Sequence, residues 1–330
     1  MRKPLPVSSR DVAKRAGVSQ STVSKVANDN TVITAETRAR VIRAARELGY
    51  VLNSGKKRYR IAVIVPEQRF VGYIAAMLSG VSQEILGRGM GMEILTDSCI
   101  SLLNERCIDG AIALCWRNDF YPKWSAVMPL PLVRINGPSN HANNCYSVCP
   151  DGMSSMRTLV ARMWSMGHRK IAFFLFNTYE HEINNVAKRL DGFLAAMESR
   201  GADAPEKYCL FDCLRKEGSE LSRQLAAWRR EGVTAVIFAN PLGTGKMMQC
   251  IQLSGLNVPR DISVVGWEQP HFSAYTVPAL STLSPDPEEF AEAAVSLLVK
   301  MISRDHRDLH DILLPYQWIE RESLSEAPHV

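Results

Sequence analysis

The 330-residue chain has no run of about 18 uncharged apolar residues, the length that a helix needs to span a bilayer. It has no N-terminal apolar segment of the kind that forms a secretory signal peptide. None of its eight cysteines forms a CxxC pair, and their spacing does not match a disulfide framework. These absences argue against a membrane or secreted protein and predict a protein of the reducing cytoplasm.

Signals for catalysis and metal binding are also missing. The seven histidines do not show the helical spacing of metal ligands, and no serine lies in a G-x-S-x-G elbow. The stretch "GTGK" at 243–246 lacks the rest of a Walker A loop, because Asn240 replaces the upstream glycine and Met247 replaces the Ser or Thr after the lysine. Two cysteine pairs spaced four apart fit core packing better than a zinc or redox site. We therefore expect no catalytic residue, no metal, no cofactor and no enzymatic activity.

Positive charge is concentrated at one end of the chain. Residues 1–60 hold 14 Lys and Arg against 4 Asp and Glu, a net charge of +10, whereas the remaining residues carry a net charge of −5. Clustered cations favour binding to the phosphate backbone of nucleic acid, because each contact releases condensed counterions. An unstructured basic tail would have the same charge, so the hydrophobic pattern must decide between a folded nucleic-acid-binding module and such a tail.

The pattern of residues 8–50 predicts three short helices. In "SSRDVAKRAG", Ser9 can cap a helix that Gly17 ends. After a three-residue turn, Ser19 can cap "QSTVSKVA", with its valines facing inward and polar side chains facing outward. Thr34 can cap a third helix. Two helices joined by a tight turn containing glycine form a helix-turn-helix, whose second helix reads bases in the DNA major groove.

The segments "RDVAKRAGVSQSTVSKVANDN" and "VITAETRARVIRAARELGY" resemble the DNA-binding headpiece of the LacI/GalR family of bacterial transcriptional regulators. By this resemblance Gln20 and Ser21 read bases and Thr22 contacts phosphate. Lys25 replaces a usual arginine and loses its bidentate fork, which weakens base discrimination. The DNA-binding residues that the resemblance and the basic linker imply are Ser19, Gln20, Ser21, Thr22, Ser24, Lys25, Asn28, Lys56, Lys57 and Arg58.

The linker between the headpiece and the rest of the chain is short. We expect a headpiece at 1–52, a basic linker at 53–60 and an effector domain at 61–330. Family members usually carry a hinge helix here, whose leucine wedges into the minor groove. Ser54 and Gly55 disfavour a helix, and no apolar wedge precedes Tyr59. The linker is therefore either a solvated tether or a segment whose cations contact DNA without a leucine kink.

From Arg60 onward, short apolar segments alternate with amphipathic helices, which predicts parallel sheets covered on both faces. About 270 residues are too many for a single sheet of this kind. We therefore expect two doubly wound lobes with a ligand cleft at the carboxyl ends of the strands. This half resembles the periplasmic-binding-protein-like effector domain of the same family, through "MGHRKIAFFLF", "RLDGF", "VIFAN", "VPRDISVVGW" and "PALSTLSPD".

The same resemblance implies an effector site. Arg189 of "RLDGF" donates its guanidinium to the ligand, and Glu268 replaces the usual aspartate. Asn240, Tyr73 and Trp267 complete the implied set. The alternative is that these side chains are ordinary core or surface groups. The sequence departs from the family at Val71-Gly72, at Pro241 and between Thr96 and Asp109, so a sugar effector cannot simply be carried over.

The predicted function is that of a bacterial, cytoplasmic, nucleoid-associated regulator. A homodimer would bind a pseudopalindromic double-stranded DNA operator, and a small molecule such as a sugar would control its affinity. Repression is the family's common mode. A dimer is favoured because no leucine heptads follow Pro315. The alternative is a DNA-binding regulator whose effector domain is vestigial and does not respond to ligand.

Overall fold

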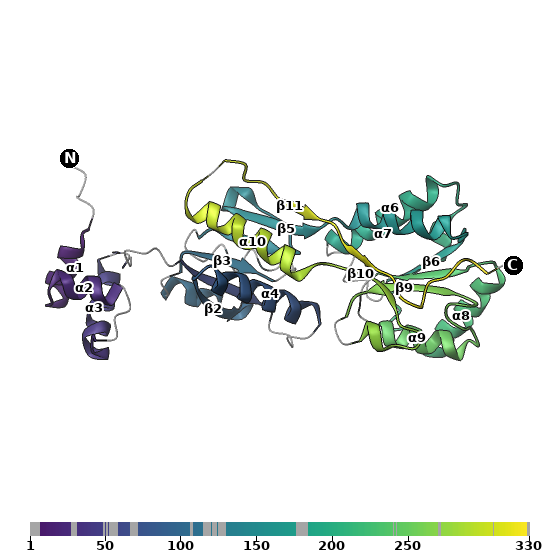
Figure 1. Ribbon diagram of the computed structural model, residues 1–330, viewed down its shortest axis with the longest axis horizontal. Coiled ribbons are helices and arrows are strands. Elements are labelled where there is room, and N and C mark those ends of the chain that lie inside the picture. Colours follow the sequence, from purple (N-terminus) through teal and green to yellow (C-terminus); the bar gives the residue numbers. More distant parts are fainter. Residues whose placement is uncertain are drawn as a thin grey trace.

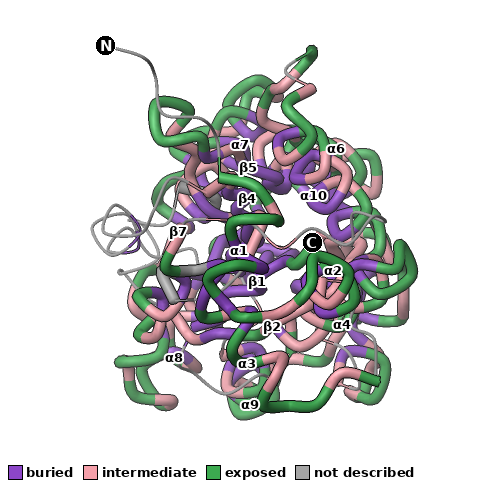
Figure 2. Tube along the Cα trace, turned by 90° about the vertical axis from the view of Figure 1, so that its left-hand side faces the viewer, coloured by how far each residue is buried: buried purple, intermediate pink, exposed green. Residues whose placement is uncertain are grey.

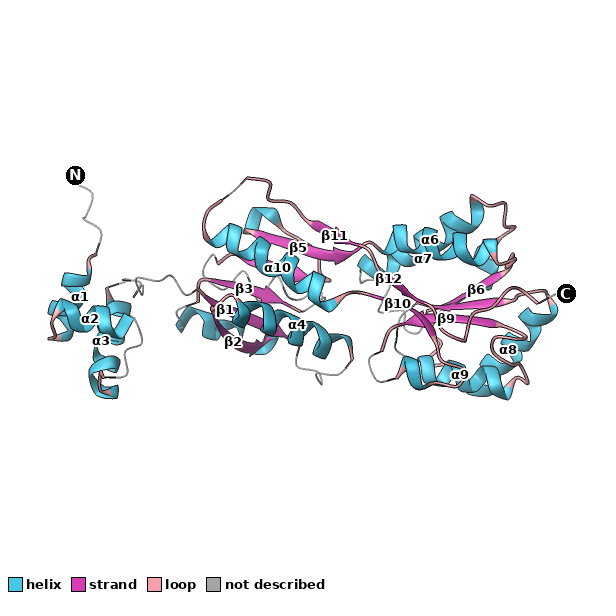
Figure 3. Cartoon of the chain, viewed as in Figure 1, coloured by secondary structure: helices cyan, strands magenta, loops and turns pink. Residues whose placement is uncertain are grey.

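The structure, a computed structural model, describes residues 7–27, 32–48, 50, 52, 59–66, 72–105, 108–114, 120, 124, 130–175, 184–239, 241, 243–269, 272–305 and 307–328. A small helical module is followed by two α/β lobes, each with a sheet between helices (Figures 1 and 3). No helix among these residues has both the length and the hydropathy needed to cross a bilayer.

The helical module contains α1 (Ser9–Ala16), α2 (Gln20–Ala27) and α3 (Ala35–Glu47). As predicted, the Ser19 hydroxyl accepts a hydrogen bond from the Thr22 amide at 3.1 Å, and the Thr34 hydroxyl accepts one from the Thr37 amide at 3.3 Å. The prediction for the first helix was wrong by one residue. Its cap is Ser8, because Ser8 and Asp11 form a reciprocal capping box.

The module has its own small core, built from the apolar faces of the three helices. Val12 and Val41 are fully buried and pack with Val23 and Val26. Gly17 ends α1 with a positive φ of 63°, a backbone conformation that a side chain would strain. The Arg40 guanidinium on α3 donates to the Ala16 carbonyl oxygen at 2.8 Å and so caps the end of α1. The turn between α1 and α2 is thereby held from both sides.

The first lobe contains a six-stranded parallel sheet in the order β11-β5-β4-β3-β1-β2. Its strands are β1 (Arg60–Val65), β2 (Gly91–Thr96), β3 (Gly110–Ala113), β4 (Leu132–Ile135), β5 (Cys145–Pro150) and β11 (Ile312–Leu314). Helices α4 (Tyr73–Gly87) and α10 (Pro287–Ile302) pack on one face. The short 3-10 helix η1 (Asp97–Glu105) packs on the other. The central strands are consequently buried on both faces (Figure 2).

The second lobe repeats this plan with the order β12-β10-β9-β8-β6-β7, in which only the β10–β12 pair is antiparallel. Its strands are β6 (Ile171–Phe174), β7 (Cys209–Leu210), β8 (Ala235–Phe238), β9 (Ser263–Trp267), β10 (Ser281–Ser284) and β12 (Gln317–Ile319). Helices α6 (Gly152–Ser165) and α7 (Asn184–Glu198) cover one face, and α8 (Gly218–Arg230) and α9 (Thr244–Leu253) cover the other (Figure 1). Short 3-10 turns lie at η2 (His141–Asn143), η4 (Pro205–Tyr208) and η5 (Ser273–Tyr275).

The described chain passes between the two lobes three times. It leaves the first sheet after β5, returns to it from β10 through residues 285–286, and leaves again between β11 and β12. The three connections lie close to one another where the lobes meet (Figure 1). This arrangement confirms the prediction of two doubly wound lobes. Connections of this kind permit hinge motion between packed bodies.

A buried histidine ties the carboxyl-terminal segment to the second lobe. His168 is inaccessible to solvent, and its Nδ1 lies 2.8 Å from Thr234 Oγ1 while its Nε2 lies 2.9 Å from the Ser325 carbonyl oxygen. One ring nitrogen can donate to the carbonyl while the other accepts from the hydroxyl, so the neutral ring satisfies both contacts. Burial accordingly lowers the pKa of His168.

We expect this histidine to make stability fall in mild acid. Because the folded pKa lies below the unfolded value of about 6.5, the unfolded chain takes up the proton first and stability is lost as the pH falls through that value. Urea unfolding at pH 7.5 and pH 5.5 should show a larger loss for the native chain than for His168→Gln. The matched control His310→Gln, at an exposed histidine, should keep the native dependence. Equal pH dependence in all three proteins would contradict the assignment.

Candidate DNA-binding face and effector site

The polar residues predicted to read DNA lie on one side of α2. Val23 and Val26 point into the core, whereas Gln20, Ser21 and Lys25 are exposed. This division follows from the helical period, because residues three apart share a face. The exposed face therefore presents amide, hydroxyl and ammonium groups without competition from apolar side chains.

Hydrogen bonds fix the amino-terminal turn of this face. The Ser19 hydroxyl lies 2.7 Å from Ser21 Oγ and 2.8 Å from Thr22 Oγ1. Gln20 Nε2 donates to Ser9 Oγ on α1 at 2.8 Å. Ser24 is exposed further along the helix. Among the predicted DNA contacts, Asn28, Lys56, Lys57 and Arg58 lie outside the described residues.

All three helices of the module carry exposed cations. The exposed basic side chains of the module are Arg10, Lys14, Arg15, Lys25, Arg40 and Arg43. Most have no acidic partner in the described module, although Arg15 pairs with Glu47 at 2.6 Å. Exposed cations flanking a polar helix face suit a duplex whose phosphates flank the groove edges.

Of the five predicted effector residues, Asn240 lies outside the described residues. The structure brings Arg189 and Trp267 together: the Arg189 guanidinium carbon lies 3.9 Å from the centroid of a Trp267 ring. Both side chains are more than nine-tenths buried. A guanidinium stacked on an aromatic face gains cation–π stabilisation and stays flat.

Close helix packing positions Arg189. It lies on α7, where a Cβ added to Gly192 would come within 2.8 Å of the Met153 Cα on α6. Phe193 is buried in the same turn and stacks on Phe173 of β6 at 5.0 Å. The Gly-Phe pair of "RLDGF" therefore holds α7 against α6 and the sheet, and this fixes the direction of the arginine.

Tyr316 is a member of the cluster that the sequence did not indicate. It lies in the connection between β11 and β12, and its hydroxyl accepts a hydrogen bond from Arg189 Nη2. Its ring packs edge-on against Trp267 with centroids 4.5 Å apart. Arg189 Nη1 also donates to the Ala239 carbonyl oxygen at 2.7 Å. The only signal for Tyr316 in the sequence was that an aromatic residue directly follows Pro315.

Tyr73 contributes from the first lobe, at the start of α4. Its hydroxyl is buried and interacts electrostatically with Tyr316 and Arg189. Burial raises the pKa of Tyr73, and burial likewise raises that of Tyr316, so both hydroxyls stay protonated at neutral pH. We call Tyr73, Arg189, Trp267 and Tyr316 the interlobe cluster.

Glu268 follows Trp267 but points to a different set of partners. Its Oε2 lies 2.8 Å from Arg321 Nη1, its Oε1 lies 3.2 Å from Arg321 Nη2, and it accepts a hydrogen bond from the Thr282 hydroxyl. Successive residues at a strand end face opposite sides of the sheet. Among the described contacts, none joins Glu268 to the interlobe cluster.

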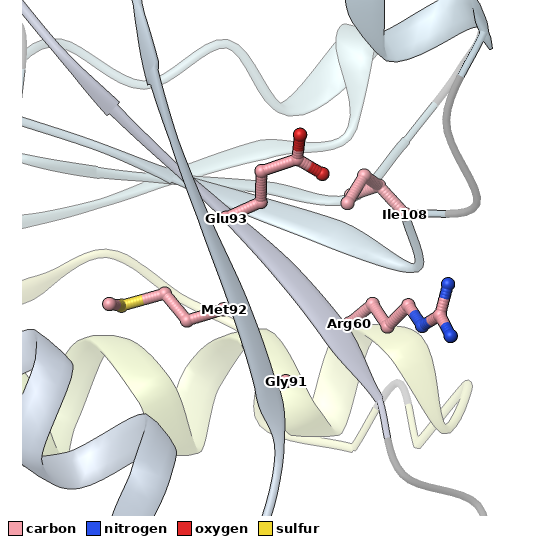
Figure 4. A pocket seen from close by; sticks show the side chains of 5 residues that line it. All are labelled: Arg60, Gly91, Met92, Glu93 and Ile108. Atoms are coloured by element: carbon pink, nitrogen blue, oxygen red, sulfur yellow. The ribbon is translucent and has the colours of Figure 1, made fainter. Parts of the chain in front are cut away.

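Two hollows on the described surface lie elsewhere. One of 250 Å³ lies at the starts of β1 and β2 and is lined by Arg60, Gly91, Met92, Glu93 and Ile108 (Figure 4). Another of 480 Å³ lies between α4 and the connection that enters α10. Neither is lined by the interlobe cluster, whose side chains pack directly against one another.

Comparison with known proteins agrees with both halves of the architecture. The family model of the bacterial regulatory proteins, lacI family, matches residues 10–53, and that of the periplasmic binding protein-like domain matches residues 160–324. The HTH-type transcriptional repressor PurR of Pectobacterium carotovorum subsp. carotovorum (strain PC1) is 25% identical over 343 residues, covering 97% of this chain and 98% of the relative.

Solved structures give the same result. A transcriptional regulator CelR–cellobiose complex is 25% identical with a TM-score of 0.68, covering 96% of this chain and 100% of that one. The lac repressor dimer bound to operator and the anti-inducer ONPF has 22% identity and a TM-score of 0.67, covering 96% and 99%, and it supports the fold. The headpiece, the two-lobed body and these matches together place the chain in the LacI/GalR family of bacterial transcriptional regulators.

Proposed function

We propose that the protein represses transcription by binding a pseudopalindromic operator as a homodimer, with an effector in the interlobe cleft controlling its affinity. The observation that carries the proposal is the exposed polar face of α2 on a basic three-helix module, joined to a two-lobed body. A helix-turn-helix presents such a face to the major groove, and dimer symmetry sets the spacing of the two half-sites.

Exposed apolar side chains support the homodimer. On the second lobe Leu253, Tyr275 and Val277 are 70%, 77% and 86% exposed, and on the first lobe Leu86 and Ile94 are 59% and 46% exposed. Where such groups form one contiguous patch, they favour a protein partner. A second copy of the chain burying these groups would hold two headpieces at a fixed distance.

The interlobe cluster supports control by an effector. It joins residues of both lobes with Tyr316 of a connecting segment, so a ligand bound among them would change how the lobes sit against each other. A solved protein of similar structure, the transcriptional regulator CelR, forms a complex with cellobiose. A vestigial body would instead leave operator affinity unchanged by any small molecule.

We propose that the protein works in the bacterial cytoplasm, at the nucleoid, where its operator DNA lies.

We propose no catalytic role. Lys246 of "GTGK" supports the absence of a nucleotide site: its ammonium donates to the carbonyl oxygens of Leu214 and Lys216 at 3.0 and 2.6 Å and so does not face a phosphate. Burial raises the pKa of the Cys209 and Cys213 thiols to about 12, which leaves them unreactive.

The recognition helix can be tested by selecting preferred sites from random DNA with the full chain. We expect the variant Gln20→Ala/Ser21→Ala to lose preference at the bases it reads and to bind the native site about 10- to 100-fold more weakly at fixed salt. Lys14→Ala, on exposed α1, should weaken all sequences alike and keep the preference. An unchanged preferred sequence in the double variant would refute the role of α2.

A further inference from the structure

The interlobe cluster presents more hydrogen-bond donors than acceptors. Arg189 Nε, Trp267 Nε1 and the Tyr73 hydroxyl are buried and have no partner among the described residues. The first two atoms can only donate, and they belong to side chains that are 8% and 3% exposed. Such groups lose their hydration without gaining a partner, so a ligand that supplies acceptors would be favoured.

The cluster also carries one positive charge without a matching negative one. Arg189 donates to a carbonyl oxygen and to the Tyr316 hydroxyl, both of them neutral. The carboxylate that sequence position implied for the site, Glu268, is already paired with Arg321 and Thr282. Among the described residues, none therefore neutralises the Arg189 guanidinium.

We propose, on the basis of the function proposed above, that the effector is a small carboxylic acid bound as a monoanion, whose carboxylate pairs with Arg189. One carboxylate balances one guanidinium, and its planar pair of oxygens matches the edge that carries Nε. A neutral sugar can accept hydrogen bonds through its hydroxyl oxygens, but it leaves the charge of the guanidinium unbalanced. A phosphate dianion would leave an uncompensated negative charge in a buried site.

The test uses ligand pairs that differ at one group. D-glucuronate differs from D-glucose by a carboxylate, and acetate and inorganic phosphate serve as minimal probes, all at one ionic strength set with sodium chloride. We expect the carboxylates to raise the melting temperature of the full chain. Calorimetry should give glucuronate an affinity about tenfold or more above that of glucose.

Variants tie the response to this arginine. Arg189→Gln should abolish the carboxylate response, and Arg189→Lys should weaken it because lysine keeps the charge but loses the fork. Lys188→Gln, the neighbouring residue on α7, removes the same charge outside the cluster and should respond as the native chain does. Circular dichroism checks that each variant is folded.

Four results would overturn the proposal: glucose binding as tightly as glucuronate, phosphate stabilising more than either carboxylate, Arg189→Gln retaining the response, or no shift with any carboxylate. Sequence-specific DNA binding by the same protein preparations is measured in a separate experiment. Carboxylate binding without sequence-specific DNA binding would refute the proposed function alone, and the reverse result would refute the carboxylate effector alone.

Discussion

Val41→Asp should abolish sequence-specific DNA binding while leaving the two-lobed body folded. Val41 is fully buried on α3 and packs with Val12 and Val23 in the only core that the described headpiece has. A module this small buries little apolar surface, so the free-energy cost of burying an unpaired carboxylate should exceed the module's free energy of unfolding. We expect fluorescence anisotropy to show operator affinity reduced about 100-fold or more, toward nonspecific binding.

The body provides an internal reference for that experiment. Its cores involve other elements, so its calorimetric unfolding transition should stay where it is in the native chain. Ala39→Asp is the matched control, because it adds the same charge on the same helix at an exposed position. If Ala39→Asp weakened binding as much as Val41→Asp did, charge repulsion from phosphate would explain both, and unfolding would not be needed.

Arg321→Met should destabilise the body by about 3–5 kcal/mol, the cost of leaving one partner of a buried ion pair alone. The Glu268 side chain is 14% exposed and that of Arg321 is 18% exposed, so water cannot easily replace the lost partner. Arg321 Nη1 also donates to the Leu280 carbonyl oxygen at 2.7 Å. Equilibrium urea unfolding of the full chain measures the change.

A double-mutant cycle separates the stranded charge from lost packing. Adding Glu268→Gln to Arg321→Met removes the unpaired carboxylate and should restore a large part of the lost stability. Glu231→Gln removes an exposed ion pair with Lys207 and should lower the free energy of unfolding by well under 1 kcal/mol, which gives the scale of a surface ion pair. A loss below that level in Arg321→Met would mean that Glu268 is already solvated or otherwise paired.

The helices were predictable because their signals are local. Ser19 and Thr34 mark helix starts through their own hydroxyl groups, which accept hydrogen bonds from the Thr22 and Thr37 amides. The sequence did not indicate β5, β10, β11 or β12. Strands β11 and β12 have only three residues each, whereas β5 and β10 contain Ser, Thr, Cys or Pro, which weaken a strand signal. Each strand forms because a neighbouring strand offers a register, as β5 does for Ile312 at Val148.

The site was predictable only to the extent that the family's motifs carry it. Position in "RLDGF" and "GWEQ" singled out Arg189 and Trp267, but their neighbours come from distant parts of the chain. Tyr316 lies 127 residues from Arg189, and Arg321 lies 53 residues from Glu268. The hydrophobic period along the chain does not reveal pairs of residues so far apart, so the pairing of Glu268 with Arg321 could not be predicted.

The three passages of the chain between the lobes bear on how the protein is made. Strand β11 completes the first sheet and β12 the second, and α10 covers a face of the first sheet that was synthesised some 150 residues earlier. On the ribosome, α1 to α3 can fold as soon as they emerge, since their core is local. Helix α4 emerges early, but the part of this face that α10 covers stays uncovered until almost the whole chain has been made. During translation this uncovered apolar surface is exposed to aggregation.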